Sequence, residues 1–216
     1  HSLGVPNNTI KKNIGSMRNQ GYEFSADWQV IAGNSFNWTL SGNVTFDENE
    51  VTSTNEGQDI LGGTFTDANY AQNLIIREGE SINSLYGFRY WGSNPANGNP
   101  VYYKADGTLV QGNLPTQTYV VFDPSNPTDI TKAASLSTAT DKVILGNTLP
   151  TYYGGINNKL DYKNWDLSFM FRFSGGNKIF NSTGRDLMTQ NLNNNSTAIL
   201  GRWQSVDEHR RRPRVR

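Results

Sequence analysis

The chain has 216 residues, with 19 basic and 19 acidic side chains, no cysteine and a formal net charge of zero. A zero net charge makes recruitment of nucleic acid unexpected, so the basic run from His209 to Arg216 reads as a solvated tail. The absence of cysteine excludes disulfides, thiolate metal sites and a cysteine nucleophile, and no apolar stretch reaches the roughly 18 residues of a membrane-spanning helix.

The first expected element is a pair of strands within residues 1–46. From Tyr22 to Val30, apolar side chains alternate with polar ones, which is the period of a strand with one apolar face. Residues 32–34 have the composition of a tight turn, and the alternation resumes from Phe36 to Phe46. The pattern predicts a hairpin.

Residues 47–150 form the next region, which is rich in Gly, Asn, Pro and Thr and carries only short apolar patches. A connection of this length without structure of its own is unusual in a compact domain. Its Tyr and Trp content argues against disorder. We therefore expect an elaborated loop region with small strands.

A second hairpin is expected within residues 151–175. Alternation runs from Tyr152 to Tyr162 and again from Trp165 to Phe173, on either side of the short Lys163-Asn164 turn. Alternation is lost over residues 176–216, which reads as a further loop and a tail.

Alternation alone fits two all-β architectures, a soluble sandwich and a transmembrane barrel. Two features favour the barrel. The expected strands have roughly the nine to eleven residues needed to cross a bilayer, whereas globular strands average nearer five or six. Short turns join the strands at one end and long excursions leave them at the other, as in outer-membrane barrels.

Aromatic residues gather within a few positions of the two short turns. They are Trp28, Phe36, Trp38, Tyr162 and Trp165. In a barrel these residues would form a membrane-interface girdle, and in a sandwich they would cap the core. A barrel needs at least about eight strands to close, so four strands predict a segment of a larger protein.

Four sequence blocks follow one another in an order that resembles the SusC/RagA family. The first is Asn13-Ile-Gly-Ser-Met-Arg-Asn-Gln-Gly-Tyr-Glu23, with paired Asn-x-Gly elements. The others are residues 78–88, residues 145–155, and residues 162–168 leading to residues 175–181, and Arg202-Trp203 resembles a later pair of the family. Together the blocks extend over nearly the whole chain.

The resemblance implies antiparallel strands of a large transmembrane β-barrel in the bacterial outer membrane, with long extracellular loops. It implies TonB-dependent import of glycan or peptide fragments together with a SusD-like surface lipoprotein. The plug and the segment that contacts TonB are not expected in this chain. The lipid bilayer would be a further partner, and nucleic acid is not one.

No catalytic site, metal site or cofactor is expected, and the chain is not predicted to be an enzyme. The two histidines, His1 and His209, stand at opposite ends of the sequence, so a histidine triad lacks its parts. Asp123, Ser125 and Asp129 have the spacing of part of a calcium loop. They lack the turn glycine and the closing glutamate, and solvated loop acids are favoured.

The loop region offers the candidate ligand or partner contacts, which are Tyr86, Phe88, Tyr90, Trp91, Tyr102 and Tyr103. Such rings stack on sugars or fill a protein interface, and they also pack a small core of the loop itself. The alternative function carried by the same residues is a soluble β-sandwich module that binds carbohydrate or acts as an adhesin.

Overall fold

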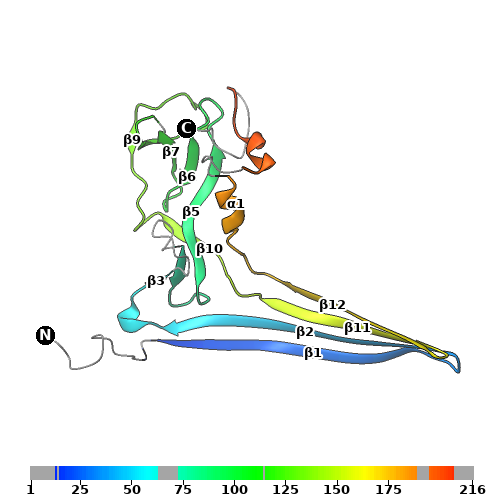
Figure 1. Ribbon diagram of the computed structural model, residues 1–216. Coiled ribbons are helices and arrows are strands. Elements are labelled where there is room, and N and C mark those ends of the chain that lie inside the picture. The colour runs from blue at the N-terminus through cyan, green and yellow to red at the C-terminus, as the bar shows by residue number, and fades with distance from the viewer. Residues whose placement is uncertain (1–12, 14, 63–72, 114, 189–194, 207–216) are drawn as a thin grey trace, which may run out of the picture. The chain divides into compact units, whose positions relative to one another are not determined.

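The computed structural model describes residues 13, 15–62, 73–113, 115–188 and 195–206 (Figure 1). Within these ranges the chain is almost wholly antiparallel β-structure, with one short helix, α1 (Ser182–Asp186), and 3-10 turns at Asn55–Gly57 and Thr197–Gly201. The all-β fold class expected from the sequence is confirmed. The two histidines and the basic run lie outside the described residues.

The chain divides into two compact units. The wall unit comprises residues 1–85 and 146–178, and the loop unit comprises residues 86–145 and 179–216. In the described part of both units, no helix combines the length and apolar character needed to cross a membrane.

A four-stranded antiparallel sheet with the order β1-β2-β11-β12 makes up most of the wall unit. The strands are β1 (Ser16–Ala32), β2 (Phe36–Ser53), β11 (Tyr152–Tyr162) and β12 (Trp165–Gly175). β11 pairs with β2 along its whole length, so two hairpins far apart in sequence lie side by side (Figure 1). β1 and β12 are the edges of the sheet, which does not close on itself over the described residues.

The strand register places all the apolar runs on one face of this sheet. Phe46 of β2 lies opposite both Tyr22 of β1 and Tyr152 of β11. Further along, Ile156 of β11 lies opposite Phe171 of β12. Because directly opposite residues of antiparallel strands share a face, one face of the sheet is apolar and the other is polar.

One residue departs from the expected alternation. A register shift sets Gln29 opposite Thr39 and Ile31 opposite Trp38, so Val30 has no residue directly opposite it. Ile31 takes the position on the apolar face that alternation assigned to Val30. A single extra residue of this kind is a β-bulge, which bends the strand before its turn.

The two short turns lie together at one end of the sheet. The Lys163 N–H donates to the Ser35 carbonyl oxygen at 3.0 Å, which joins the β11–β12 turn to the β1–β2 turn. Lys163 has a φ of 53°, in the left-handed region that two-residue hairpins use. The asymmetry of short and long connections is therefore present in the wall unit.

The hairpin β1–β2 is longer than the alternation predicted, because the apolar alternation stops at Tyr22 and Phe46 whereas the strand pairing continues beyond them. β1 has 17 residues and β2 has 18, and β2 continues past the expected limit at residue 46 to Ser53. Side chains pair across this extension, with Arg18 donating to Glu50 at 2.6 Å and Gln20 donating to Glu48 at 2.9 Å. We call residues 16–21 and 47–53 the hairpin extension.

Residues 79–82 of the wall unit are hydrogen-bonded to the hairpin extension. The Val51 N–H donates to the Glu80 carbonyl oxygen, and the Gly79 N–H donates to the Val51 carbonyl oxygen, both at 2.9 Å. The Asn49 side-chain oxygen accepts the Ile82 N–H at 2.7 Å. These bonds use the edge of β2 that β11 leaves open beyond Tyr152.

The remaining strands form a second antiparallel sheet in the order β3-β4-β5-β6-β7-β8-β9, with β10 paired to β5. They are β3 (Ile60–Gly62), β4 (Leu74–Ile76), β5 (Ser84–Ser93), β6 (Pro100–Tyr103), β7 (Leu109–Asn113), β8 (Thr118–Val121), β9 (Ala133–Ala134) and β10 (Lys142–Gly146). All of them lie between residues 60 and 146.

The loop unit has a core of its own, built on β6, β7 and β8. Val101, Val110 and Val120 are buried there. Gln111 is fully buried as well, and its side-chain oxygen accepts from the Asn94 amide at 2.8 Å and the Asn97 amide at 3.1 Å. A buried amide is tolerated when its hydrogen bonds are made, so this cluster ties residues 94–97 to β7.

Candidate functional site

The apolar face of the wall sheet is exposed rather than packed. The exposed fractions of Trp165, Tyr22 and Trp28 are 79%, 74% and 64%. Other large apolar side chains of the same face are also exposed, including Phe24, Phe46, Ile156, Leu167 and Phe171. A continuous apolar surface of this extent is unfavourable in water and marks a face that meets protein or lipid.

Aromatic residues mark the end of the apolar face next to the short turns. Tyr162 lies directly opposite both Phe36 and Trp165. On the same face, Trp38 lies one row and Trp28 two rows further from the turns. The structure therefore brings the five expected girdle residues to one end of one face.

A second aromatic row, which alternation did not single out, lies at the opposite end of the apolar face. It consists of Tyr22, Phe46 and Tyr152, in register across three strands. Tyr152 and Tyr162 are the two ends of β11, ten positions apart. At about 3.4 Å per residue and about 45° of tilt, the two rows are about 24 Å apart along the barrel axis. Known outer-membrane barrels have an apolar band about 25 Å tall between two aromatic girdles.

One polar residue stands inside the apolar band. Asn158 of β11 lies between Leu40 and Phe169 on the apolar face, yet only 9% of it is exposed. The Trp38 indole N–H donates to its side-chain oxygen at 3.3 Å. Trp38 thereby covers Asn158 and meets its own need for an acceptor, which hydrocarbon could not supply.

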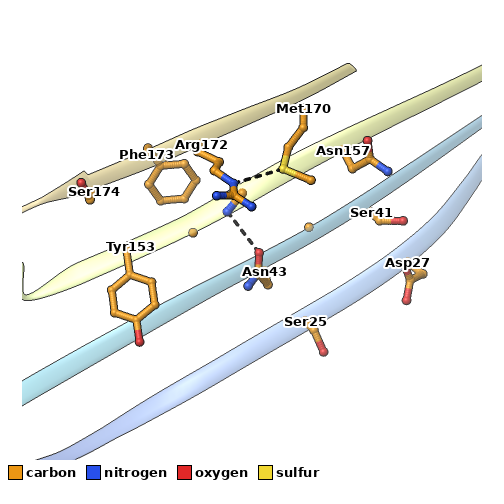
Figure 2. Close-up of a pocket in the computed structure, with 13 residues that line it drawn as sticks. Ser25, Asp27, Ser41, Asn43, Tyr153, Asn157, Met170, Arg172, Phe173 and Ser174 are labelled. Atoms are coloured by element: carbon orange, nitrogen blue, oxygen red, sulfur yellow. Dashed lines mark hydrogen bonds between the residues drawn. The ribbon is translucent and has the colours of Figure 1, made fainter. Parts of the chain in front are cut away.

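The polar face of the same sheet carries a hollow of about 630 Å³ (Figure 2). Residues of all four strands line it, including Ser25, Asn43, Gly155 and Arg172. Asn43 accepts the Gly155 N–H at 3.1 Å, and the Arg172 Nε–H donates to the Met170 sulfur at 3.4 Å, as the dashed lines in Figure 2 show. The hollow combines a guanidinium with amide and hydroxyl groups, as a site for a polar ligand does.

The six loop aromatics lie in the loop unit and contact other groups of that unit. Tyr102 packs against Tyr90 and Phe88, with ring centroids 5.6 Å and 6.2 Å apart. Trp91 packs against the buried Phe122 at 5.1 Å, and the Arg89 guanidinium lies 3.9 Å from the Tyr103 ring centroid. Tyr86 is buried, 5.5 Å from the Lys142 ammonium. Most of this aromatic surface thus packs within the unit.

Two of these rings, Tyr90 and Trp91, are also partly exposed and remain candidates for contact with a ligand or partner. Burial, followed by the neighbouring Tyr102, raises the pKa of Tyr90, and burial raises the pKa of Tyr102. Both phenols are therefore neutral hydrogen-bonding groups at physiological pH.

Asp123 and Asp129 of the loop unit are engaged in local turns. The Asp123 carboxylate accepts the Ser125 hydroxyl at 2.7 Å, and Asp129 accepts the Thr131 hydroxyl at 2.7 Å. These hydroxyls, with the backbone N–H groups of the same residues, lower the pKa of both acids. Over the described residues, no three His, Asp or Glu side chains are grouped to hold a metal ion.

The chain was compared with protein families, curated proteins and solved structures. No protein-family model matches the chain. The chain is 31% identical over 213 residues to the TonB-dependent receptor P3 of Formosa agariphila, which covers 94% of this chain and 19% of that receptor. It is 26% identical over 184 residues to the TonB-dependent receptor SusC of Bacteroides thetaiotaomicron, which covers 81% of this chain and 15% of SusC.

Among solved structures, the RagAB peptide transporter superposes with a TM-score of 0.67 at 19% identity, covering 94% of this chain and 20% of that chain. The wall sheet and its loops therefore have the fold of a segment of a large β-barrel. The chain is a SusC/RagA-like segment of a TonB-dependent transporter, as its sequence blocks indicated. It spans about a fifth of the length of the relatives it matches.

Proposed function

We propose that this chain forms part of the wall of a TonB-dependent transporter in the bacterial outer membrane. In this proposal the transporter imports glycan or peptide fragments together with a SusD-like surface lipoprotein. The supporting observation is the exposed apolar face, bounded at both ends by aromatic rows about 24 Å apart. In this proposal the apolar face of the wall sheet contacts lipid acyl chains, and its polar face lines the barrel interior.

The hairpin extension and the loop unit stand on the extracellular side in this proposal, because long connections leave barrel strands on that side. The short turns at residues 33–35 and 163–164 then face the periplasm. A lipoprotein partner would meet the loops rather than the wall. Tyr90 and Trp91, the most exposed of the six loop aromatics, are available to it.

The names of the relatives support transport as the general activity. The relatives are named as TonB-dependent receptors, and the RagAB neighbour is named as a peptide transporter. A soluble β-sandwich module is not favoured, because a sandwich buries the apolar faces of its strands against a second sheet. In the wall unit these faces are exposed.

Site-directed spin labelling of the whole transporter in lipid vesicles tests the placement of the two faces. A nitroxide at Phe171→Cys is expected to collide readily with oxygen and poorly with a water-soluble nickel chelate. A nitroxide at Ser168→Cys, on the polar face of the same strand, is the matched control and should show the reverse preference. Equal access of the nickel chelate to both positions would contradict the proposal.

Uptake itself needs a separate measurement in cells. Deleting the gene for the transporter, or the TonB protein, should abolish growth on the imported oligomer, while growth on its monomer continues. Deleting the gene for the SusD-like lipoprotein should have a similar, smaller effect. Unchanged growth in all three strains would refute an uptake role.

A further inference from the structure

We infer that the hollow on the polar face of the wall sheet is a carboxylate-binding site with Arg172 as its cationic residue. This inference rests on the proposed function, because it takes the polar face as the inner wall of a barrel. The ligand is a carboxylate carried either by the plug that the barrel would enclose, here called the enclosed segment, or by an imported solute.

The site is built from one row of residues that crosses the sheet. Ser25 of β1, Asn43 of β2, Gly155 of β11 and Arg172 of β12 lie opposite one another in turn. Gly155 has no side chain, so the floor between Asn43 and Arg172 is open. Figure 2 shows Arg172 and Asn43 on either side of this floor.

The guanidinium of Arg172 has more N–H donors than there are hydrogen-bond acceptors around it among the described residues. Its recorded hydrogen bond goes from Nε to the Met170 sulfur, which is a weak acceptor. Over the described residues, no carboxylate lies within ion-pair distance of Arg172. A guanidinium is always charged and presents a planar fork of N–H donors that matches the two oxygens of a carboxylate.

Asn43 adds a second donor beside Arg172. Its side-chain oxygen accepts the Gly155 N–H, which leaves its amide NH₂ group to donate elsewhere. The hydroxyls of Ser25 and Tyr153 also line the hollow. Donors therefore predominate at this end of the site.

The charge of the hollow favours a single carboxylate over a doubly charged anion. Its lining residues include one cation, Arg172, and one acid, Asp27. Asp27 is on β1 and Arg172 is on β12, three strand spacings apart, which is about 14 Å. At that distance Asp27 cannot pair with Arg172, and a charged group on the wall of an enclosed barrel is expected to have a partner.

The test is modification of Arg172 by phenylglyoxal in the whole transporter, followed by mass spectrometry. The soluble probes are tri-glutamate and tri-glutamine, both amidated at the C-terminus, so that they differ in carrying side-chain carboxylates or none. Pairing should slow the modification at least about tenfold relative to a short peptide of the same sequence, as for an ordinary charge-assisted pair.

Two outcomes support the inference and identify the source of the carboxylate. Protection at rest that is lost when the enclosed segment is deleted assigns the carboxylate to the transporter itself. Protection that appears with tri-glutamate and not with tri-glutamine assigns it to the solute. Fast modification under every condition, or slow modification that neither change affects, overturns the inference.

Variants provide a second readout. If the carboxylate comes from the solute, tri-glutamate should raise the melting temperature of the transporter, and Arg172→Gln should abolish that rise. If the partner is internal, Arg172→Gln should itself lower the melting temperature. Arg172→Lys should restore part of either effect. Lys159→Gln is the matched control, because this cation of the same face already lies 3.5 Å from Asp161. If the spin labels place the faces as proposed and Arg172 still reacts freely, this inference alone fails.

Discussion

The indole N–H of Trp38 donates to the side-chain oxygen of Asn158 at 3.3 Å, on the face of the wall sheet that is otherwise apolar. In a hydrocarbon environment the indole N–H requires an acceptor, which Asn158 supplies. The amide of Asn158 requires a hydrogen-bonding partner and shielding from the hydrocarbon, and Trp38 supplies both. The pair joins β2 to β11, so it also fixes the contact between the two hairpins.

We expect Asn158→Leu to leave the Trp38 N–H without an acceptor, at a cost of about 1–3 kcal/mol. Trp38→Phe removes the donor, so the double variant should lose less than the sum of the two single losses. The measurement is the free energy of unfolding of the transporter in detergent or lipid, analysed as a double-mutant cycle. Additive losses would show that the hydrogen bond contributes nothing.

The apolar face should reject a charge in the middle of its band. Phe171→Arg is expected to destabilise the membrane-inserted transporter by about 2–4 kcal/mol, the cost of arginine at the bilayer midplane. Ser168→Arg, on the polar face of the same strand, should cost far less. Comparable losses for the two variants in denaturant titrations from vesicles would argue against a lipid-facing surface.

The turn at Lys163 offers a test of backbone conformation. A non-glycine residue at φ 53° is strained by roughly 1–2 kcal/mol, so Lys163→Gly should be neutral or stabilising. Lys163→Ile should destabilise, because a β-branched side chain is disfavoured there. The melting temperature should fall for Lys163→Ile and stay unchanged or rise for Lys163→Gly, and a fall in both variants would contradict the expectation.

Gln111 is expected to hold the loop unit together through its buried oxygen. Gln111→Leu would remove the acceptor that the amides of Asn94 and Asn97 share, leaving the Asn94 amide its bond to the Pro127 carbonyl oxygen, at a cost of about 1–3 kcal/mol. Hydrogen exchange over residues 94–99 should accelerate accordingly. Gln204→Leu, at an exposed position, is the control, and equal exchange in the two variants would refute the role of Gln111.

Alkaline pH should weaken the loop unit. Burial raises the folded-state pKa of Tyr90 and Tyr102 above 10.0, so their stabilising contribution is complete below about pH 10 and is lost as pH rises through the folded values. A phenolate absorbance titration should show late-titrating tyrosines in the folded transporter. Tyr90→Phe should remove one of them, and unfolding should return the rest to the ordinary range.

Much of the wall could be predicted from the sequence, because a period of two is visible without a structure. The runs from Phe36 to Phe46 and from Trp165 to Phe173 stand in the strands that alternation assigned to them. The hairpin extension was missed, since Glu48 and Glu50 break the apolar pattern although their strand continues.

Features that depend on register could not be read from the sequence. The row of Tyr22, Phe46 and Tyr152 exists only because three strands align, and nothing within any one strand marks it. Asn158 interrupts the apolar alternation of β11, and its meaning depends on Trp38, far away in the sequence. The hollow beside Arg172 likewise needs the pairing of four strands.

The unequal lengths of the two hairpins have a consequence for how such proteins diverge. β1 and β2 continue as a self-paired ladder where β11 has already ended, and the chain leaves β2 after Ser53, at the end of that ladder. In the proposed placement, insertions and deletions beyond Ser53 are separated from the lipid-facing rows by the hairpin extension, so the loops can diversify while the membrane-embedded rows stay unchanged.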